Sequence, residues 1–149
     1  MLDAISDSFF DDFEFLLGKA RELDEASLHK IGSMQKVHIV DKNPEDALIA
    51  SDFAWVGSGS STLQSVIFNT PFILLYKTSF LSWIIMKKFI RVKYAGMPNI
   101  ILDSPLIPEL LQENLTPEKI IIETKRFFND TMYRKSLFTG YKNILKELG

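Results

Sequence analysis

Short apolar segments alternate along the chain with segments of helical spacing, and this alternation constrains the fold more than any other feature. The apolar segments have the length of strands and are bounded by Gly, Pro, Asn or Asp. One of them is almost entirely apolar, which is typical of a strand covered on both faces, as in a parallel sheet. The pattern therefore predicts an α/β domain with a mostly parallel sheet. The expected strands are Phe13–Leu17, Val37–Val40, Phe53–Val56 and the most apolar one, Phe72–Tyr76.

Helices are expected between and after these strands. Pro44 and Pro117 suit the first position of a helix, and Asn43 and Thr116 precede them as caps. Met97-Pro98-Asn99 is expected to lie in a loop. The expected helices cover about Leu23–Ile31, a short stretch from Pro44, about Thr62–Phe68, a segment that ends near Ile90, and three segments that begin near Ile107, Pro117 and Tyr133.

The length and the composition exclude several classes of protein. A chain of 149 residues suits one domain, and the absence of cysteine excludes disulfides, a thiolate metal site and a cysteine nucleophile. The two histidines, His29 and His38, are interpreted as structural, so no metal site is expected. No apolar run approaches the roughly 18 residues of a membrane-spanning helix, and the start of the chain does not resemble a secretory signal. We expect a cytoplasmic location.

The charges are unevenly distributed. The chain carries 12 acidic and 5 basic residues up to Ser60, and 7 acidic and 12 basic residues after it. This division favours an anionic partner for the C-terminal half, such as a phosphate, a nucleotide or an anionic lipid. The alternative is that a positive surface merely balances a negative one. Nucleic acid is not expected, because basic and aromatic residues are not interleaved as they are in RNA-binding proteins.

A turn rich in glycine and serine follows the third expected strand, in the sequence Gly57-Ser58-Gly59-Ser60-Ser61. A strand that leads through small residues into a helix leaves backbone N–H groups exposed, and such groups can hold a phosphate. Three known motifs do not fit this turn. The dinucleotide-binding fingerprint requires a glycine where the chain has Thr62, and the residues that the P-loop and the hydrolase elbow require are missing. The alternative interpretation is an ordinary tight turn with a serine cap.

Several dissimilar motifs follow one another in a fixed order along nearly the whole chain. Together they resemble the C-terminal domain of the lipid-A-disaccharide synthase family, whose pattern runs roughly S-G-T-A-T-L-E, T-P, Y-R, L-P-N and E-L-L-Q-E. The segment Phe13–Leu17 is similar to the second strand of that domain. The motifs in this chain are Gly59-Ser60-Ser61-Thr62-Leu63-Gln64, Thr70-Pro71-Phe72, Tyr76-Lys77, Tyr94, Met97-Pro98-Asn99-Ile100 and Pro108-Glu109-Leu110-Leu111-Gln112-Glu113.

The resemblance implies a Rossmann-like domain, the C-terminal half of a two-domain GT-B glycosyltransferase. Such an enzyme joins UDP-2,3-diacylglucosamine to lipid X, forms the β-1′,6-linked disaccharide of lipid A and releases UDP. The C-terminal domain holds the UDP-sugar lipid donor at the carboxyl ends of its strands. No cofactor is implied. Two alternatives stay open: a nucleotide-binding remnant without catalysis, and a partner subunit of a split synthase.

The resemblance also implies which residues bind the donor. Ser58, Gly59, Ser60 and Ser61 correspond to the pyrophosphate site, and Gln64 corresponds to a glutamate suited to the ribose hydroxyls. The remaining implied positions are Lys77, Asn99 and Gln112.

Three departures from the family pattern affect this site. Ser60 replaces threonine and keeps the hydroxyl, Gln64 replaces glutamate and loses a charge, and Lys77 replaces arginine and loses its bidentate fork. Without the resemblance, Lys77 could be a solvated lysine at a strand end, and Asn99 could close a turn.

The first strand of the family's domain and its whole acceptor domain have no counterpart in the chain. We therefore predict that residues 1–149 form one incomplete donor domain, and that an acceptor domain or a second chain completes it. No general base, and hence no catalytic residue, is assigned. Because the missing strand would lie in the middle of the sheet, we expect a gap between Phe13–Leu17 and Phe53–Val56. A homo-oligomer is left open.

The segment from Phe80 to Lys93 is apolar at its start and cationic at its end, with Trp83 near the start. An interfacial helix that contacts anionic lipid has this pattern, and so does a core helix whose lysines reach the solvent. The diacylated substrates of the family favour peripheral contact with the cytoplasmic face of the inner membrane of a Gram-negative-type bacterium.

Overall fold

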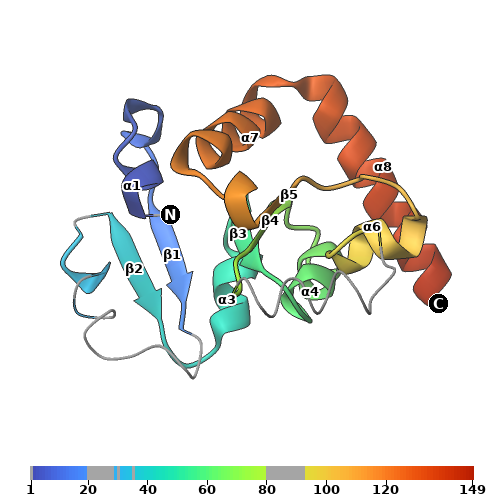
Figure 1. Cartoon of the computed structure of the whole chain (residues 1–149). Coiled ribbons are helices and arrows are strands. Elements are labelled where there is room, and N and C mark those ends of the chain that lie inside the picture. The colour runs from blue at the N-terminus through green and yellow to red at the C-terminus, as the bar shows by residue number, and fades with distance from the viewer. Residues whose placement is uncertain (1, 20–28, 30, 35, 80–92) are drawn as a thin grey trace.

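The structure is a computed structural model that describes residues 2–19, 29, 31–34, 36–79 and 93–149. In this part of the chain, strands and helices alternate, and all strand pairs are parallel (Figure 1). The predicted α/β fold with parallel strands is thereby confirmed. The strands are β1 (Phe15–Gly18), β2 (Val37–Val40), β3 (Ala54–Gly57), β4 (Phe72–Tyr76) and β5 (Glu109–Leu111). The helices are α1 (Leu2–Ile5), α3 (Pro44–Ile49), α4 (Ser61–Ile67), α6 (Met97–Leu102), α7 (Pro117–Asn129) and α8 (Thr131–Leu148), with short 3-10 helices at Ser8–Phe10 (η1) and Gln112–Asn114 (η2).

The strands form two separate sheets. One has the order β1-β2, and the other has the order β3-β4-β5. In the residues that the structure describes, β1 and β3 do not pair with each other. The sheet is therefore interrupted at the place where the sequence predicts a gap.

Aromatic side chains of the N-terminal segment and of the two strands meet at this interruption. The ring centroid of Phe15 on β1 lies 5.7 Å from that of Trp55 on β3, and Phe10 contacts both rings at the same centroid distance. Phe10 is buried, and Ala4 of α1 packs in a cluster with Ile73. Side-chain contacts rather than a backbone ladder thus join the two sheets.

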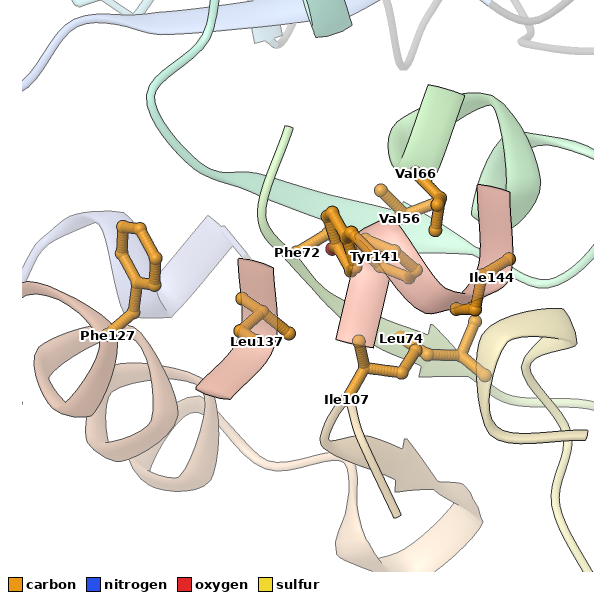
Figure 2. Close-up of a cluster of buried hydrophobic side chains, with 9 residues drawn as sticks. All are labelled: Val56, Val66, Phe72, Leu74, Ile107, Phe127, Leu137, Tyr141 and Ile144. Carbon is orange, nitrogen blue, oxygen red and sulfur yellow. The ribbon is translucent and has the colours of Figure 1, made fainter. Parts of the chain in front are cut away.

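The three-stranded sheet is covered on both faces. On one face, nine buried side chains from β3, β4, α4, α7, α8 and the segment before β5 form the main core (Figure 2). On the other face, Ile73 and Leu110 pack with Ile120 of α7 and Ala4 of α1. Phe72, Ile73 and Leu74 have no exposed surface, which confirms that β4 is covered on both faces. The core in Figure 2 consists of Val56, Val66, Phe72, Leu74, Ile107, Phe127, Leu137, Tyr141 and Ile144.

The helix starts follow local capping chemistry. The Thr116 hydroxyl accepts a hydrogen bond from the Lys119 N–H at 3.3 Å, which confirms the predicted cap of α7. Helix α8 begins two residues before the predicted Tyr133, because the Asp130 carboxylate accepts from the Tyr133 N–H at 2.9 Å. Helix α3 starts at Pro44 as predicted, although the side chain of Asn43 forms no capping hydrogen bond.

Three boundary predictions are wrong. Met97-Pro98-Asn99 lies in the first turn of α6 and not in a loop. A proline is tolerated there because the N–H groups of the first turn have no hydrogen-bond partner within the helix. No helix begins at Ile107, because the chain there enters β5, which pairs with β4. The first strand begins at Phe15 and not at Phe13, whose ring packs against Phe9 and Phe10.

Two predicted segments lie mostly outside the described residues. These are the helix at Leu23–Ile31 and the apolar and cationic segment from Phe80. Their interpretations stay predictions. Of the described helices, none is both long enough and apolar enough to cross a membrane.

Candidate functional site

The carboxyl ends of β3, β4 and β5 meet at one edge of the larger sheet. In the register of the parallel strands, Gly57 pairs with Leu75, and Tyr76 pairs with Leu111. The next residue along each strand is Ser58, Lys77 or Gln112, and all three therefore lie at the same edge. The tertiary structure thus brings together predicted site residues from three segments of the chain.

The turn after β3 is held by bonds within the turn itself. Gly59 has φ +121°, a conformation that side chains with a Cβ rarely adopt. The carbonyl of Gly59 accepts from the hydroxyl of Thr62 at 2.8 Å and from its N–H at 3.2 Å. Thr62 is buried, so these bonds fix the turn against α4. Thr62, which the sequence left unassigned, is therefore the residue that anchors this turn.

The outer side of the turn faces open space. A Cβ atom placed on Gly57 or on Gly59 would have no heavy atom within 4 Å. Ser58 and Ser60 are exposed, while Ser61 and Gln64 are partly buried in the first turns of α4. The Ser60 side chain makes no capping hydrogen bond to α4. Its hydroxyl, like that of Ser58, is therefore available for a bound molecule.

Gln112 connects the ends of β4 and β5. It is buried, with φ +51°, at the start of η2. In the amide orientation that satisfies both groups, its nitrogen donates to the Thr78 carbonyl at 3.1 Å, and its oxygen accepts from the Thr78 N–H at 3.2 Å. These bonds hold the backbone next to exposed Lys77. Gln112 thus positions the loop that carries Lys77.

Asn99 lies elsewhere, near the amino end of β5. Its side chain is 1% exposed, and its amide nitrogen donates to the Ile107 carbonyl at 2.9 Å and to Glu109 Oε1 at 2.8 Å. Its amide oxygen accepts from the Ile107 N–H at 2.9 Å. All of its hydrogen-bonding groups thus face the interior, and the structure does not bring Asn99 together with the turn after β3.

Glu109 is a residue that the sequence analysis named only as part of a motif. Its carboxylate accepts from the N–H groups of Ala95 and Gly96, at 2.8 and 2.9 Å, and from Asn99. It therefore satisfies the backbone at the start of α6. The available signal was a charged residue in an otherwise apolar segment, because a partly buried carboxylate requires nearby donors.

Two hollows on the described surface are lined by residues outside the turn. One of about 540 Å³ is lined by residues before β3 and β4, by α7 and by the first turns of α8, including Arg134 and Lys135. Another, of about 350 Å³, lies between the segment before β5 and the helices α7 and α8, next to Tyr133. Burial raises the pKa of Tyr133 to about 12. Of the predicted binding residues, Asn99 lines this second hollow, whereas Ser58, Ser60 and Lys77 are exposed at the carboxyl edge of the sheet.

The parallel strands and the packing of both faces of the larger sheet define an α/β protein with parallel sheets. The sequence model of the lipid-A-disaccharide synthetase family matches residues 6–146. The chain therefore belongs to this family.

Curated relatives show the same similarity. The chain is 30% identical over 141 residues to the lipid-A-disaccharide synthase of Anaeromyxobacter dehalogenans, which covers 93% of the chain and 37% of that protein. It is 37% identical over 98 residues to the lipid-A-disaccharide synthase of Chromobacterium violaceum, which covers 66% of the chain and 25% of that protein. The matches thus cover between a quarter and little more than a third of the length of these two relatives.

Proposed function

We propose that this chain supplies the donor-binding part of a glycosyltransferase of lipid A biosynthesis. The donor is UDP-2,3-diacylglucosamine, and the acceptor is lipid X. The observation that carries the proposal is the family match over residues 6–146. The exposed turn at the carboxyl edge of β3 supports it, because ligands of open parallel sheets bind at that edge.

The edge contains the groups that a diphosphate requires. The backbone and hydroxyls of Ser58–Ser61 donate hydrogen bonds to the diphosphate, and Lys77 supplies positive charge. Gln64 accepts from the ribose hydroxyls. Gln112 acts indirectly, through its two bonds to Thr78. Asn99 shapes the protein at the amino end of β5 and has no contact with the donor in this proposal.

These groups favour the departure of UDP. The acceptor hydroxyl oxygen forms a bond to the anomeric carbon of the donor, and the bond from that carbon to the diphosphate breaks. Negative charge then develops on the diphosphate, where hydrogen-bond donors and Lys77 stabilise it. The acceptor hydroxyl also loses a proton, and we assign no residue of this chain as its acceptor. The acceptor-binding part and the general base belong to another part of the synthase in this proposal.

Calorimetric titration of the chain with UDP tests the proposal. We expect saturable binding that Lys77→Ala weakens by about tenfold, the value typical of a lost charge-assisted contact. Lys142→Ala is the matched control, since Lys142 is also exposed but lies on α8. If the wild-type chain fails to bind UDP, or if both variants bind it equally, the proposed donor site is wrong.

Turnover is tested separately from binding. The chain is mixed with UDP-2,3-diacylglucosamine, lipid X and a second polypeptide that carries the unmatched part of a relative, and disaccharide formation is measured. Product that depends on Lys77 supports the enzyme. UDP binding without any product instead supports a nucleotide-binding module without catalysis.

A further inference from the structure

The larger of the two hollows, of about 540 Å³, lies at the amino ends of β3 and β4. Ser51 and Asp52 precede β3, Asn69 and Pro71 precede β4, and all four residues line this hollow. The turn after β3 lies at the opposite end of the same sheet. A volume of this size is typical of sites for small molecules. We call this site the amino-edge hollow, and the length of the strands separates it from the proposed donor site.

Aromatic side chains form the apolar wall of the amino-edge hollow. Phe127 and Phe128 come from the end of α7, and Phe138 comes from α8. The rings of Phe127 and Phe128 meet edge to face, with centroids 5.2 Å apart. Phe127 is buried, whereas Phe128 and Phe138 are only partly buried, so their rings keep surface that water contacts. A ligand with an apolar body is stabilised when it covers this surface.

Two cations lie beside this aromatic wall, Arg134 and Lys135 of α8. The guanidinium carbon of Arg134 lies 6.0 Å from the ring centroid of Phe127, and Arg134 Nη2 donates to the Thr131 hydroxyl at 3.3 Å. These contacts hold the guanidinium next to the wall. Among the described residues, no carboxylate lies within 4 Å of the side-chain nitrogens of Arg134 or Lys135. Both charges are therefore open to an anionic ligand.

The charges of the lining favour a monoanion. Of the described residues that line the hollow, Asp52 is the only acid, while Arg134 and Lys135 are the bases, so two positive charges and one negative charge leave a net charge of +1. Asp52 precedes β3 and the two bases lie on α8, so we expect the anionic group on the α8 side. A carboxylate suits this side, because the planar guanidinium of arginine matches its two oxygens.

We propose that the amino-edge hollow binds a small aromatic carboxylate. The carboxylate accepts hydrogen bonds from Arg134, which uses one of its five N–H donors on Thr131, and Lys135 adds positive charge. The ring of the ligand covers Phe128 and Phe138, where edge-to-face contacts favour an aromatic body over a saturated one. The site goes beyond the proposed function, because it lies at the opposite end of the sheet from the donor site and needs no UDP.

NMR titration of the chain with 2-naphthoate tests the proposal. We expect saturable shifts of the amide signals of Asn69, Thr131 and Lys135, which line the hollow, and no shift at Ser58 or Ser60. Saturating UDP should leave the affinity for 2-naphthoate unchanged. A failure of the donor site and a failure of the amino-edge hollow are therefore observed separately.

Three related probes separate the contributions of charge, apolar body and aromatic ring. 2-Naphthamide keeps the ring but lacks the charge, and it should bind at least tenfold more weakly than 2-naphthoate, because a charge-assisted contact is lost. Acetate keeps the charge but lacks the ring, and it should also bind at least tenfold more weakly. Decahydro-2-naphthoate has a saturated body, and its affinity should be about two- to tenfold lower.

Variants of the lining locate the carboxylate. Arg134→Gln removes one positive charge and should weaken the binding of 2-naphthoate by about tenfold or more. Lys142→Gln is the matched control and should bind like the wild type, because Lys142 is exposed on the same helix but does not line the hollow. Asp52→Asn removes the acid and should bind at least as tightly as the wild type.

Four results would overturn the proposal. The first is the absence of saturable shifts at the amino-edge hollow. The second is that 2-naphthamide, acetate or decahydro-2-naphthoate binds as tightly as 2-naphthoate. The third is an equal affinity of Arg134→Gln and Lys142→Gln, and the fourth is weaker binding by Asp52→Asn. If circular dichroism shows that Arg134→Gln is unfolded, the comparison of 2-naphthoate with 2-naphthamide on the wild type decides the question.

Discussion

Replacement of Asn99 by alanine separates a structural role from a role in donor binding. Asn99 is 1% exposed, and its side-chain amide bonds to both backbone groups of Ile107, at 2.9 Å each. Ile107 is itself 2% exposed, so water reaches these groups only if the structure opens. Asn99→Ala therefore leaves a buried N–H and a buried C=O without partners. Glu109 loses one donor but keeps the N–H groups of Ala95 and Gly96.

The expected loss of stability follows from these two groups. Each buried polar group left without a partner costs about 1–3 kcal/mol. Two of them give a loss of about 2–6 kcal/mol, and entry of a water molecule would shift the value to the lower part of this range. A domain of this size has an unfolding free energy of about 5–15 kcal/mol, so the change is readily measured. Asn99→Asp should cost more, since it also places a carboxylate beside that of Glu109.

Urea denaturation followed by circular dichroism measures this loss. Asn143→Ala is the matched control, because Asn143 is exposed on α8 and its replacement should change the unfolding free energy by less than about 0.5 kcal/mol. UDP titration of folded Asn99→Ala should give the wild-type affinity. The structural role would be refuted if Asn99→Ala matched the control in stability, or if it were fully stable and bound UDP at least tenfold more weakly.

Two further predictions concern packing and pH. A Cβ on Gly140 would lie 2.3 Å from Leu106 Cδ1, so Gly140→Ala should lower the unfolding free energy by about 1–3 kcal/mol. Gly57→Ala is the control and should not lower it, because a Cβ on Gly57 would have no heavy atom within 4 Å. Equal urea midpoints of the two variants would contradict this prediction. Burial raises the pKa of Tyr133 to about 12, from about 10 in the unfolded chain, so its contribution to stability is complete below pH 10 and is lost as the pH rises toward 12. The urea midpoint should fall over this range, and less steeply in Tyr133→Phe; identical slopes would contradict the assignment.

Local sequence signals predicted the elements whose causes lie within a few residues. Thr116 and Pro117 start α7 through a hydrogen bond and a backbone angle that need no distant partner. The apolar run of β4 predicted a strand buried on both faces, and Phe72, Ile73 and Leu74 are fully buried. Where the apolar pattern was long or the cap was local, the sequence was a sufficient guide.

The elements that the sequence missed depend on distant partners. Strand β5 has only three residues, and it is a strand because Leu110 and its neighbours pair with β4. Helix α6 contains a Pro-Asn signal that usually indicates a turn, but the carboxylate of Glu109 accepts from the backbone at the start of the helix. Neither the pairing of β5 with β4 nor the bonding of Glu109 to the start of α6 is recognisable from a short window of sequence.

The amino-acid sequence by itself determined the α/β class, the turn of small residues between β3 and α4, and membership of the lipid-A-disaccharide synthetase family. Only the tertiary structure decided that Ser58, Lys77 and Gln112 share one edge and that Asn99 is turned into the interior. The physical reason is the range of the interactions. Turn and cap chemistry acts within a few residues, whereas strand pairing and the satisfaction of buried polar groups join residues that are distant in the sequence.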